Sequence, residues 1–187
     1  MLQFFVRFSG IFAIIAAWML VIYPAIRFGI NTRKETVSLA TLKNEQVGKV
    51  VSFGLVVGTL FQIIFLFYFS QKFLLNYFSF GSLLYLTANS ATIFVAFFTY
   101  KNYPTIHKFF VEYYFFAMPI SLVFLVYHLK DTSAHILFSF SIFILILYFV
   151  GQLLLFLKHK ESNSLMEAWA FAMLSAWTLV VTFFPGL

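Results

Sequence analysis

The sequence predicts an all-α fold, a polytopic membrane protein built as a six-helix transmembrane bundle. Hydrophobic residue types make up 63% of the 187 residues and charged types only 10%, whereas soluble domains are about 45–50% apolar and about 25% charged. A soluble globule of this size cannot bury so much apolar surface. The apolar residues fall into six runs, each near the roughly 20 residues that a helix needs to cross hydrocarbon. They do not alternate strictly in polarity, as the strands of a transmembrane barrel do.

The six predicted spans form a single transmembrane domain that covers residues 1–187. Inside lipid the backbone must satisfy its own hydrogen bonds, so long apolar runs become helices. The first run follows Arg7 as in a signal peptide, but it is long and ends in Pro24 and Arg27 rather than at a small-residue cleavage site. We therefore expect a retained first span. The spans are about 8–26, 50–69, 80–100, 109–129, 134–157 and 166–184.

The loops predict the orientation. Only the loop at 27–49 is long, and its Thr32 and Glu35 fit a capping box; the short loops favour antiparallel neighbours. Nine of the 12 Lys and Arg residues lie in the first, third and fifth loops, which places these loops in the cytoplasm and both termini outside. Their distribution fits membrane lipids as partners and no nucleic acid. The nine are Arg27, Arg33, Lys34, Lys43, Lys49, Lys101, Lys108, Lys158 and Lys160.

Small residues predict where the helices pack closely. Gly54 and Gly58 are four residues apart in the second span and form a face that lets two backbones approach. We expect this face to pack within the bundle, with a dimer interface as the alternative. Pro119 lies in the middle of the fourth span, where it is expected to kink the helix.

Polar side chains inside the spans predict a candidate site. An ionisable group at membrane depth costs at least about 2.5–3.5 kcal/mol on insertion scales, so it usually faces protein or water. Glu112 and Glu167 each lie about one turn into a helix that begins on the cytoplasmic side, and Gln152 lies at a similar depth. Together they predict a vestibule open to the cytoplasm, suited to a polar headgroup, a cation or a proton. Alternatively, each acid lies in the interface and only contacts headgroup water, with Glu112 paired to Lys108.

Three further residues are candidate ligand contacts. His107 lies beside the vestibule, while Gln62 and Asn89 lie near the middle of the membrane, where an interhelical hydrogen bond is the alternative role. The four histidines bracket spans rather than pairing within the bilayer, and no ligand spacing for a metal is present. We therefore expect no cofactor and no metal.

Two stretches are similar to a known group of membrane proteins. The first is Glu-Thr-Val-Ser-Leu-Ala at 35–40 with Val-Ser-Phe-Gly-Leu-Val-Val-Gly at 51–58; the second is Pro-Thr-Ile-His-Lys-Phe-Phe at 104–110, leading to Phe116 and Pro119. They resemble the first loop, second helix and fourth-helix entry of the DRAM/FRAG/Sfk-like group of six-span proteins, whose prokaryotic branch has no known function. The resemblance implies a six-helix bundle with lipid- or sterol-linked roles, and makes Ser38 and His107 the positions to test.

Three functions are compatible with these features. The leading hypothesis is non-enzymatic binding or transport of a lipid or small amphiphile through the vestibule, because Glu112, Glu167 and Gln152 lie at one depth beside the Pro119 kink. No nucleotide-binding loop or hydrolase elbow is present. The second is a structural or accessory subunit of a larger membrane complex, with other membrane subunits as partners. The third is an enzyme that acts on lipid headgroups, with Glu112 or Glu167 as acid or base and His107 assisting.

Overall fold

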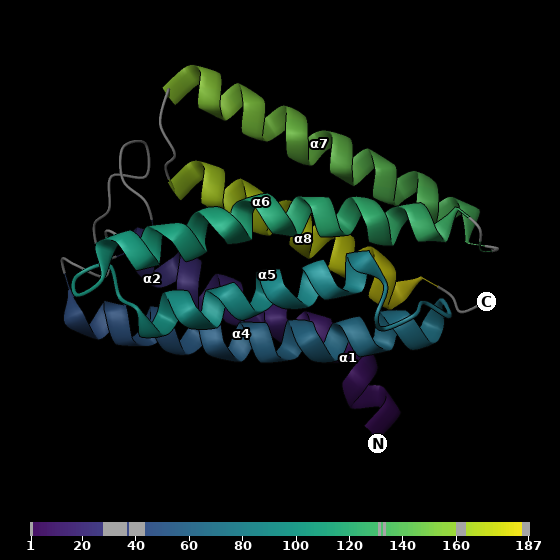
Figure 1. The fold of residues 1–187 in the computed structure, drawn as a ribbon, viewed down its shortest axis with the longest axis horizontal. Coiled ribbons are helices and arrows are strands. Elements are labelled where there is room, and N and C mark those ends of the chain that lie inside the picture. The colour runs from purple at the N-terminus through teal and green to yellow at the C-terminus, as the bar shows by residue number, and fades with distance from the viewer. Residues whose placement is uncertain are drawn as a thin grey trace.

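A computed structural model describes residues 2–27, 37, 44–130, 132, 134–159 and 164–184 of the chain. Apart from short turns, these residues are helical, and six of the helices are long and apolar enough to cross a membrane. They run along one common direction (Figure 1). The predicted all-α, six-helix membrane bundle is therefore confirmed.

The first span is helical from α1 (Leu2–Ala16) through a π-helical segment, η1 (Ala17–Ile22), into α2 (Tyr23–Arg27). Most helices extend beyond the apolar runs because their polar ends are also helical. Asn44, for example, caps the second span by accepting hydrogen bonds from the N–H groups of Gln46 and Val47. The other spans are α4 (Glu45–Lys72), α5 (Phe80–Phe97), α6 (Pro104–Leu129), α7 (His135–His159) and α8 (Ser164–Phe183).

The π-helical segment has a local cause in Pro24. Proline has no N–H, and its ring crowds the carbonyl of Leu20 four residues earlier, which disfavours a regular α-helical turn there. The N–H of Tyr23 bonds to the Trp18 carbonyl five residues earlier, as in a π-helix. Gly54 of α4 packs against this segment, and a Cβ added there would lie 2.5 Å from the Leu20 Cβ. The small-residue face of α4 thus contacts the first span of the same chain.

The spans differ in how much of their surface is buried by the protein itself. In the most apolar part of α5, 50% of the residues are buried, against 22% in α7. The main core packs residues of α4, α5, α6 and α8 around Phe65, Phe69 and Trp177. α7 lies at the outer edge of the bundle and diverges from α6 towards its own C-terminal end (Figure 1). Hydrocarbon is the solvent that suits its exposed Phe, Ile and Leu side chains.

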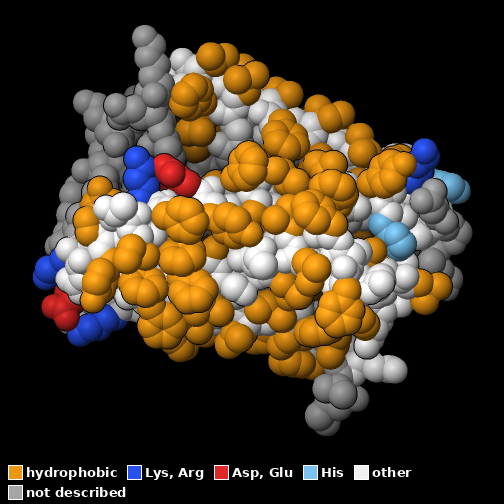
Figure 2. Space-filling view, viewed as in Figure 1, with side chains coloured by type: hydrophobic (Ala, Val, Ile, Leu, Met, Phe, Trp, Pro, Cys, Tyr) orange, Lys and Arg blue, Asp and Glu red, His pale blue; other side chains and the backbone are white. Residues whose placement is uncertain are grey.

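Charged side chains gather near the two ends of the bundle, and hydrophobic side chains cover the middle of the face in Figure 2. The end that holds the start of α4, α6 and α8 is called the Arg27 end. The opposite end, where α4 stops, is called the Lys72 end. This distribution is that of an integral membrane protein with its spans perpendicular to two polar layers.

Candidate functional site

A groove between α6 and α7, which reaches the start of α8, brings together Glu112, Gln152 and Glu167. Its volume is about 360 Å³. Two of its apolar side chains, Phe116 and Phe149, are 70% and 46% exposed, so the groove is open along the surface that faces lipid. The lining residues are Val111, Glu112, Phe115, Phe116, Pro119, Ile120, Tyr148, Phe149, Gln152, Met166 and Glu167.

The polar end of this groove is held by contacts between α7 and α8. The side-chain amide of Gln152 donates a hydrogen bond to the Met166 carbonyl at 2.8 Å. The indole N–H of Trp169 donates to the Leu147 carbonyl at 3.2 Å. This contact requires a glycine at position 151, because a Cβ there would lie 2.1 Å from the Trp169 Nε1. Gly151 therefore lets the indole pack directly on the α7 backbone.

Glu112 occupies the exposed rim of the groove. Its carboxylate lies 3.6 Å from the Lys108 ammonium, one turn earlier on α6, and both side chains are largely exposed. The ion pair expected as an alternative role for Glu112 is thus present, and Glu112 also lines the groove. The rim consequently offers an acidic and a basic group side by side.

Glu167 is buried, with only 5% of its surface exposed. Its Oε2 accepts a hydrogen bond of 2.7 Å from the backbone N–H of Val37, which lies between α2 and α4. No Lys or Arg in the described ranges forms an ion pair with it. A buried carboxylate is stable when it is neutralised or receives several hydrogen bonds. The position therefore favours a cationic ligand, a donor group or a proton.

Towards the Lys72 end, a second hollow of about 460 Å³ lies between α6 and α7, and Phe149 lines both this hollow and the groove. Four lining residues of α6 are separated by four, seven and four positions, so they share one face of the helix. They are Glu112, Phe116, Val123 and Tyr127. Glu112 and Tyr127 are about 22 Å apart along the helix axis. The groove and the hollow together thus have one polar end and a long, largely apolar part, the polarity pattern of an amphiphile.

Pro119 adds a polar feature to the middle of the groove. α6 continues through this residue as one helix from Pro104 to Leu129. Because proline lacks an N–H, the carbonyl of Phe115 loses the donor that position 119 would otherwise supply. Phe115 and Pro119 both line the groove. A backbone acceptor is therefore present close to the acidic end.

His107 lies on another side of Glu167, beside an internal cavity of about 70 Å³ that Glu167 also lines. The ring is buried, and its Nδ1 lies 2.8 Å from the carbonyl of Phe98 at the end of α5. A water molecule needs about 10–15 Å³ measured in this way, so the cavity has room for a few. Its polar lining residues are Ser52, Thr92, Thr99, His107, Tyr114 and Glu167.

Gln62 and Asn89 lie deeper and do not reach the α6–α7 groove; they line a smaller internal cavity of about 40 Å³. The hydroxyl of Tyr85 on α5 donates to the side-chain oxygen of Gln62 on α4, so Gln62 makes an interhelical hydrogen bond. Asn89 instead donates to the Tyr85 carbonyl on its own helix at 2.9 Å. These two residues link and fill the interior between α4 and α5.

Sequence reasoning missed Val37, Met166 and the aromatic groove wall. Phe116, Phe149 and Tyr148 carried a usable signal, because each lies three or four residues from a polar lining residue of its own helix, Glu112 on α6 or Gln152 on α7. Val37 carried none, since a single valine in a loop does not indicate a donor to a carboxylate. Ser38 lies outside the described residues. Within the described ranges, no group of three His, Asp or Glu side chains is placed to hold a metal ion.

Comparison of the chain with models of protein families, with curated proteins and with solved structures finds no match. The functional assignment therefore depends on the geometry of this chain alone.

Proposed function

We propose that this integral membrane protein binds a lipid or small amphiphile in the α6–α7 groove. The polar group lies at Glu112, Gln152 and Glu167, and the hydrocarbon chain follows the neighbouring hollow. The observation that carries the proposal is the change of lining along the α6–α7 interface, from acids and an amide at the Arg27 end to aliphatic and aromatic side chains in the neighbouring hollow.

The groups around the polar end favour a headgroup that carries a positive charge or N–H donors. Two carboxyl groups and the Phe115 carbonyl are acceptors. Lys108, paired with Glu112 on the rim, is a partner for a phosphate. A zwitterionic headgroup such as phosphoethanolamine carries both complementary groups, an ammonium for the acids and a phosphate for the lysine.

The open side of the groove lets such a ligand enter sideways from the bilayer. Hydrocarbon already surrounds an acyl chain in the membrane, so its transfer into the groove gives little hydrophobic free energy. Discrimination between amphiphiles must then come from the headgroup. We therefore expect substitutions at the acids to change affinity more than conservative substitutions along the apolar wall.

The test uses a photoactivatable phosphatidylethanolamine, with a diazirine on its acyl chain, in phosphatidylcholine vesicles that contain the protein. Labelled peptides from α6 and α7 are measured by mass spectrometry. The double variant Glu112→Gln, Glu167→Gln should label about tenfold less, because hydrogen bonds to charged groups contribute about 1.5–3 kcal/mol. Glu45→Gln is the matched control, since Glu45 forms a similar exposed pair with Lys49 at the same end.

A second pair of variants tests the apolar part. Ile120→Trp places a larger side chain in the groove, whereas Phe143→Trp changes an exposed residue of α7 that does not line it. Ile120→Trp should reduce labelling and Phe143→Trp should not. Unchanged labelling in both the acid variant and Ile120→Trp would reject the proposal.

We also propose that the Arg27 end faces the cytoplasm. Among the described residues, Arg27, Lys49, Lys101, Lys108 and Lys158 lie at that end, against Arg7, Lys72 and Lys130 at the other. The chain has no cysteine, so a single introduced cysteine is the only thiol of the protein that a maleimide can label. An impermeant maleimide added to intact cells should label Lys130→Cys and spare Lys101→Cys; the reverse pattern would invert the orientation.

A further inference from the structure

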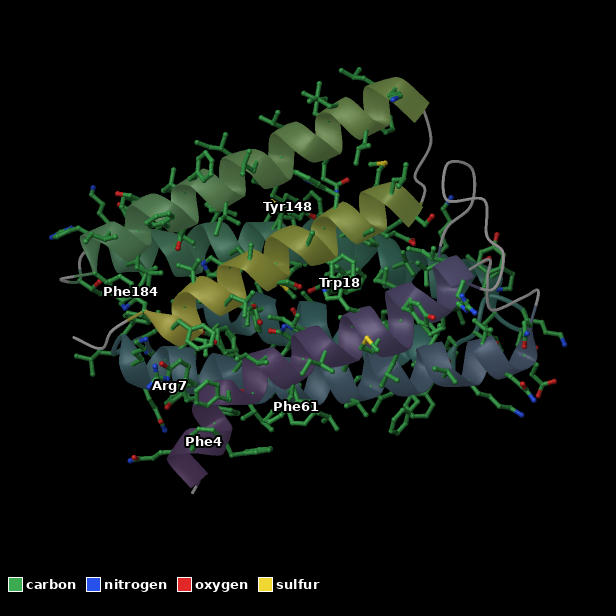
Figure 3. The ribbon with its side chains drawn as sticks, turned by 180° about the vertical axis from the view of Figure 1, so that it is seen from behind. Phe4, Arg7, Trp18, Phe61, Tyr148 and Phe184 are labelled. Carbon is green, nitrogen blue, oxygen red and sulfur yellow. The ribbon has the colours of Figure 1, made fainter. Side chains whose placement is uncertain are left out.

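A second groove lies between α1 and α4 at the Lys72 end, away from the α6–α7 groove. Its volume is about 930 Å³, and it is lined by the basic residues Arg7 and Lys72 and by the polar residues Gln3 and Gln71. Figure 3 shows Phe4 and Arg7 on the first turns of α1, which project from the bundle, with Phe184 on the same side. Nothing in the proposed function uses this groove.

Both cations are held in place by the last turn of α8. The Lys72 ammonium donates to the carbonyls of Val181 and Phe184 at 3.0 and 2.7 Å. The Arg7 Nε donates to the Thr182 carbonyl at 3.3 Å. These contacts use two of the three N–H bonds of the ammonium and one of the five of the guanidinium. Donors remain on both groups after the helix end is satisfied.

Among the described residues, the groove is lined by two cations and by no Asp or Glu. Neither Arg7 nor Lys72 forms an ion pair within the described ranges. Two cations on one surface repel each other, and an anion between them removes that repulsion and accepts the remaining hydrogen bonds. The planar guanidinium is suited to two parallel bonds with a phosphate.

The walls distinguish a lipid from a soluble anion. Phe4 and Phe67 are 65% and 47% exposed on the surface that faces the bilayer, and Ile64 and Phe8 extend the apolar lining. Arg7 and Lys72 lie near the ends of their spans, at the depth where phospholipid phosphates occur. We propose that the α1–α4 groove binds an anionic phospholipid, with its phosphate at Arg7 and Lys72 and its acyl chains along Phe4, Phe8, Ile64 and Phe67.

Native mass spectrometry of the full chain in detergent tests this site, with phosphatidylglycerol and phosphatidylcholine of the same chain length as probes. The wild-type protein should bind phosphatidylglycerol more tightly. Arg7→Gln should weaken that binding about tenfold, the effect of losing a charge-assisted hydrogen bond, and leave phosphatidylcholine binding unchanged. Lys130→Gln is the matched control, because Lys130 is a basic residue at the same end that does not line the groove.

Equal binding of the two lipids by the wild-type protein would overturn the proposal, and this measurement is independent of whether any variant folds. An equal loss in Lys130→Gln would also overturn it, since the preference would then be a general effect of surface charge. Glycerol 1-phosphate in solution should not compete; effective competition would assign the site to a soluble anion. Glu112→Gln should retain phosphatidylglycerol binding, which separates this result from the α6–α7 groove.

Discussion

The α6–α7 groove and the α1–α4 groove have similar apolar walls but charges of opposite sign. Phe and Ile side chains line both, while Glu112 and Glu167 stand at the Arg27 end of the first, and Arg7 and Lys72 at the Lys72 end of the second. In a bilayer, apolar walls alone discriminate little between lipids. Under the two binding proposals, a few charged residues would therefore decide which amphiphile each groove accepts.

The two grooves also differ in what else their charged residues do. Among the described residues, Glu112 pairs with an exposed lysine on its own helix, whereas Lys72 and Arg7 bind the backbone carbonyls that end α8. Substitution of Glu112 should therefore leave the packing of the bundle intact. The cations stabilise the bundle as well as the groove, so their substitution affects both.

The largest expected effect on stability is that of Gly151→Leu, which should separate α7 from α8. The added side chain must displace the Trp169 indole and its hydrogen bond to Leu147, and overpacking together with that loss should lower the free energy of unfolding by about 3 kcal/mol. Phosphatidylethanolamine labelling in the α6–α7 groove should fall, while phosphatidylglycerol binding in the α1–α4 groove remains. Unfolding in mixed detergent and dodecyl sulfate measures the stability.

Gly58→Ala is the control for this change, since a Cβ at position 58 would make an ordinary 3.7 Å contact with Ala16. Its stability should stay within about 0.5 kcal/mol of wild type. If Gly151→Leu unfolds no more easily than Gly58→Ala, the α7–α8 contact does not hold the groove wall.

A smaller effect is expected from Lys72→Met, which removes both hydrogen bonds to the end of α8. Charge-assisted bonds of this kind contribute about 1.5–3 kcal/mol each when fully buried; because Lys72 is only half-buried, we expect a combined loss of about 2 kcal/mol. Glu112→Gln should cost less than about 0.5 kcal/mol, as exposed pairs one turn apart do. Equal losses in the two variants would remove the distinction between structural cations and a rim acid.

A further small effect concerns the interior between the grooves. Tyr85→Phe removes the donor to Gln62 and should cost about 0.6 kcal/mol, the average for a hydrogen bond between membrane helices. Replacing Gln62 by Leu in the same chain should recover part of this loss, because no buried acceptor is then left unpaired. Neither variant should alter lipid binding in either groove. Altered binding in one groove would show that the interior cavities affect that groove.

The fold was predictable because the bilayer restricts a long apolar run to a helix. Depth along a span was predictable for the same reason, since each residue adds about 1.5 Å; this is why Glu112, Gln152 and Glu167 were expected together. The position of a residue around its helix was also predictable, but His107 was nevertheless assigned to the same site as Glu112. His107 precedes Glu112 by five residues and so lies about 140° away around α6, which directs it to the internal cavity.

The α1–α4 groove was not predicted, and its basic residues served only as indicators of orientation. Nothing local in the sequence shows that Arg7 and Lys72 meet the carbonyls of residues 181–184, because these partners are separated by more than 100 positions. The DRAM/FRAG/Sfk-like resemblance stays a prediction, as does the role it gives to Ser38 and His107.

The contacts of Arg7 and Lys72 with the end of α8 have a consequence for biosynthesis. Both cations leave the ribosome well before the carbonyls that they bind. Until the sixth span is inserted, they remain exposed to headgroups beside an unfinished bundle, where anionic lipids are their available counterions. Insertion of the last helix would then be a late assembly step that supplies the carbonyl partners of both cations. A nascent protein halted before that helix would have two positive charges without these partners.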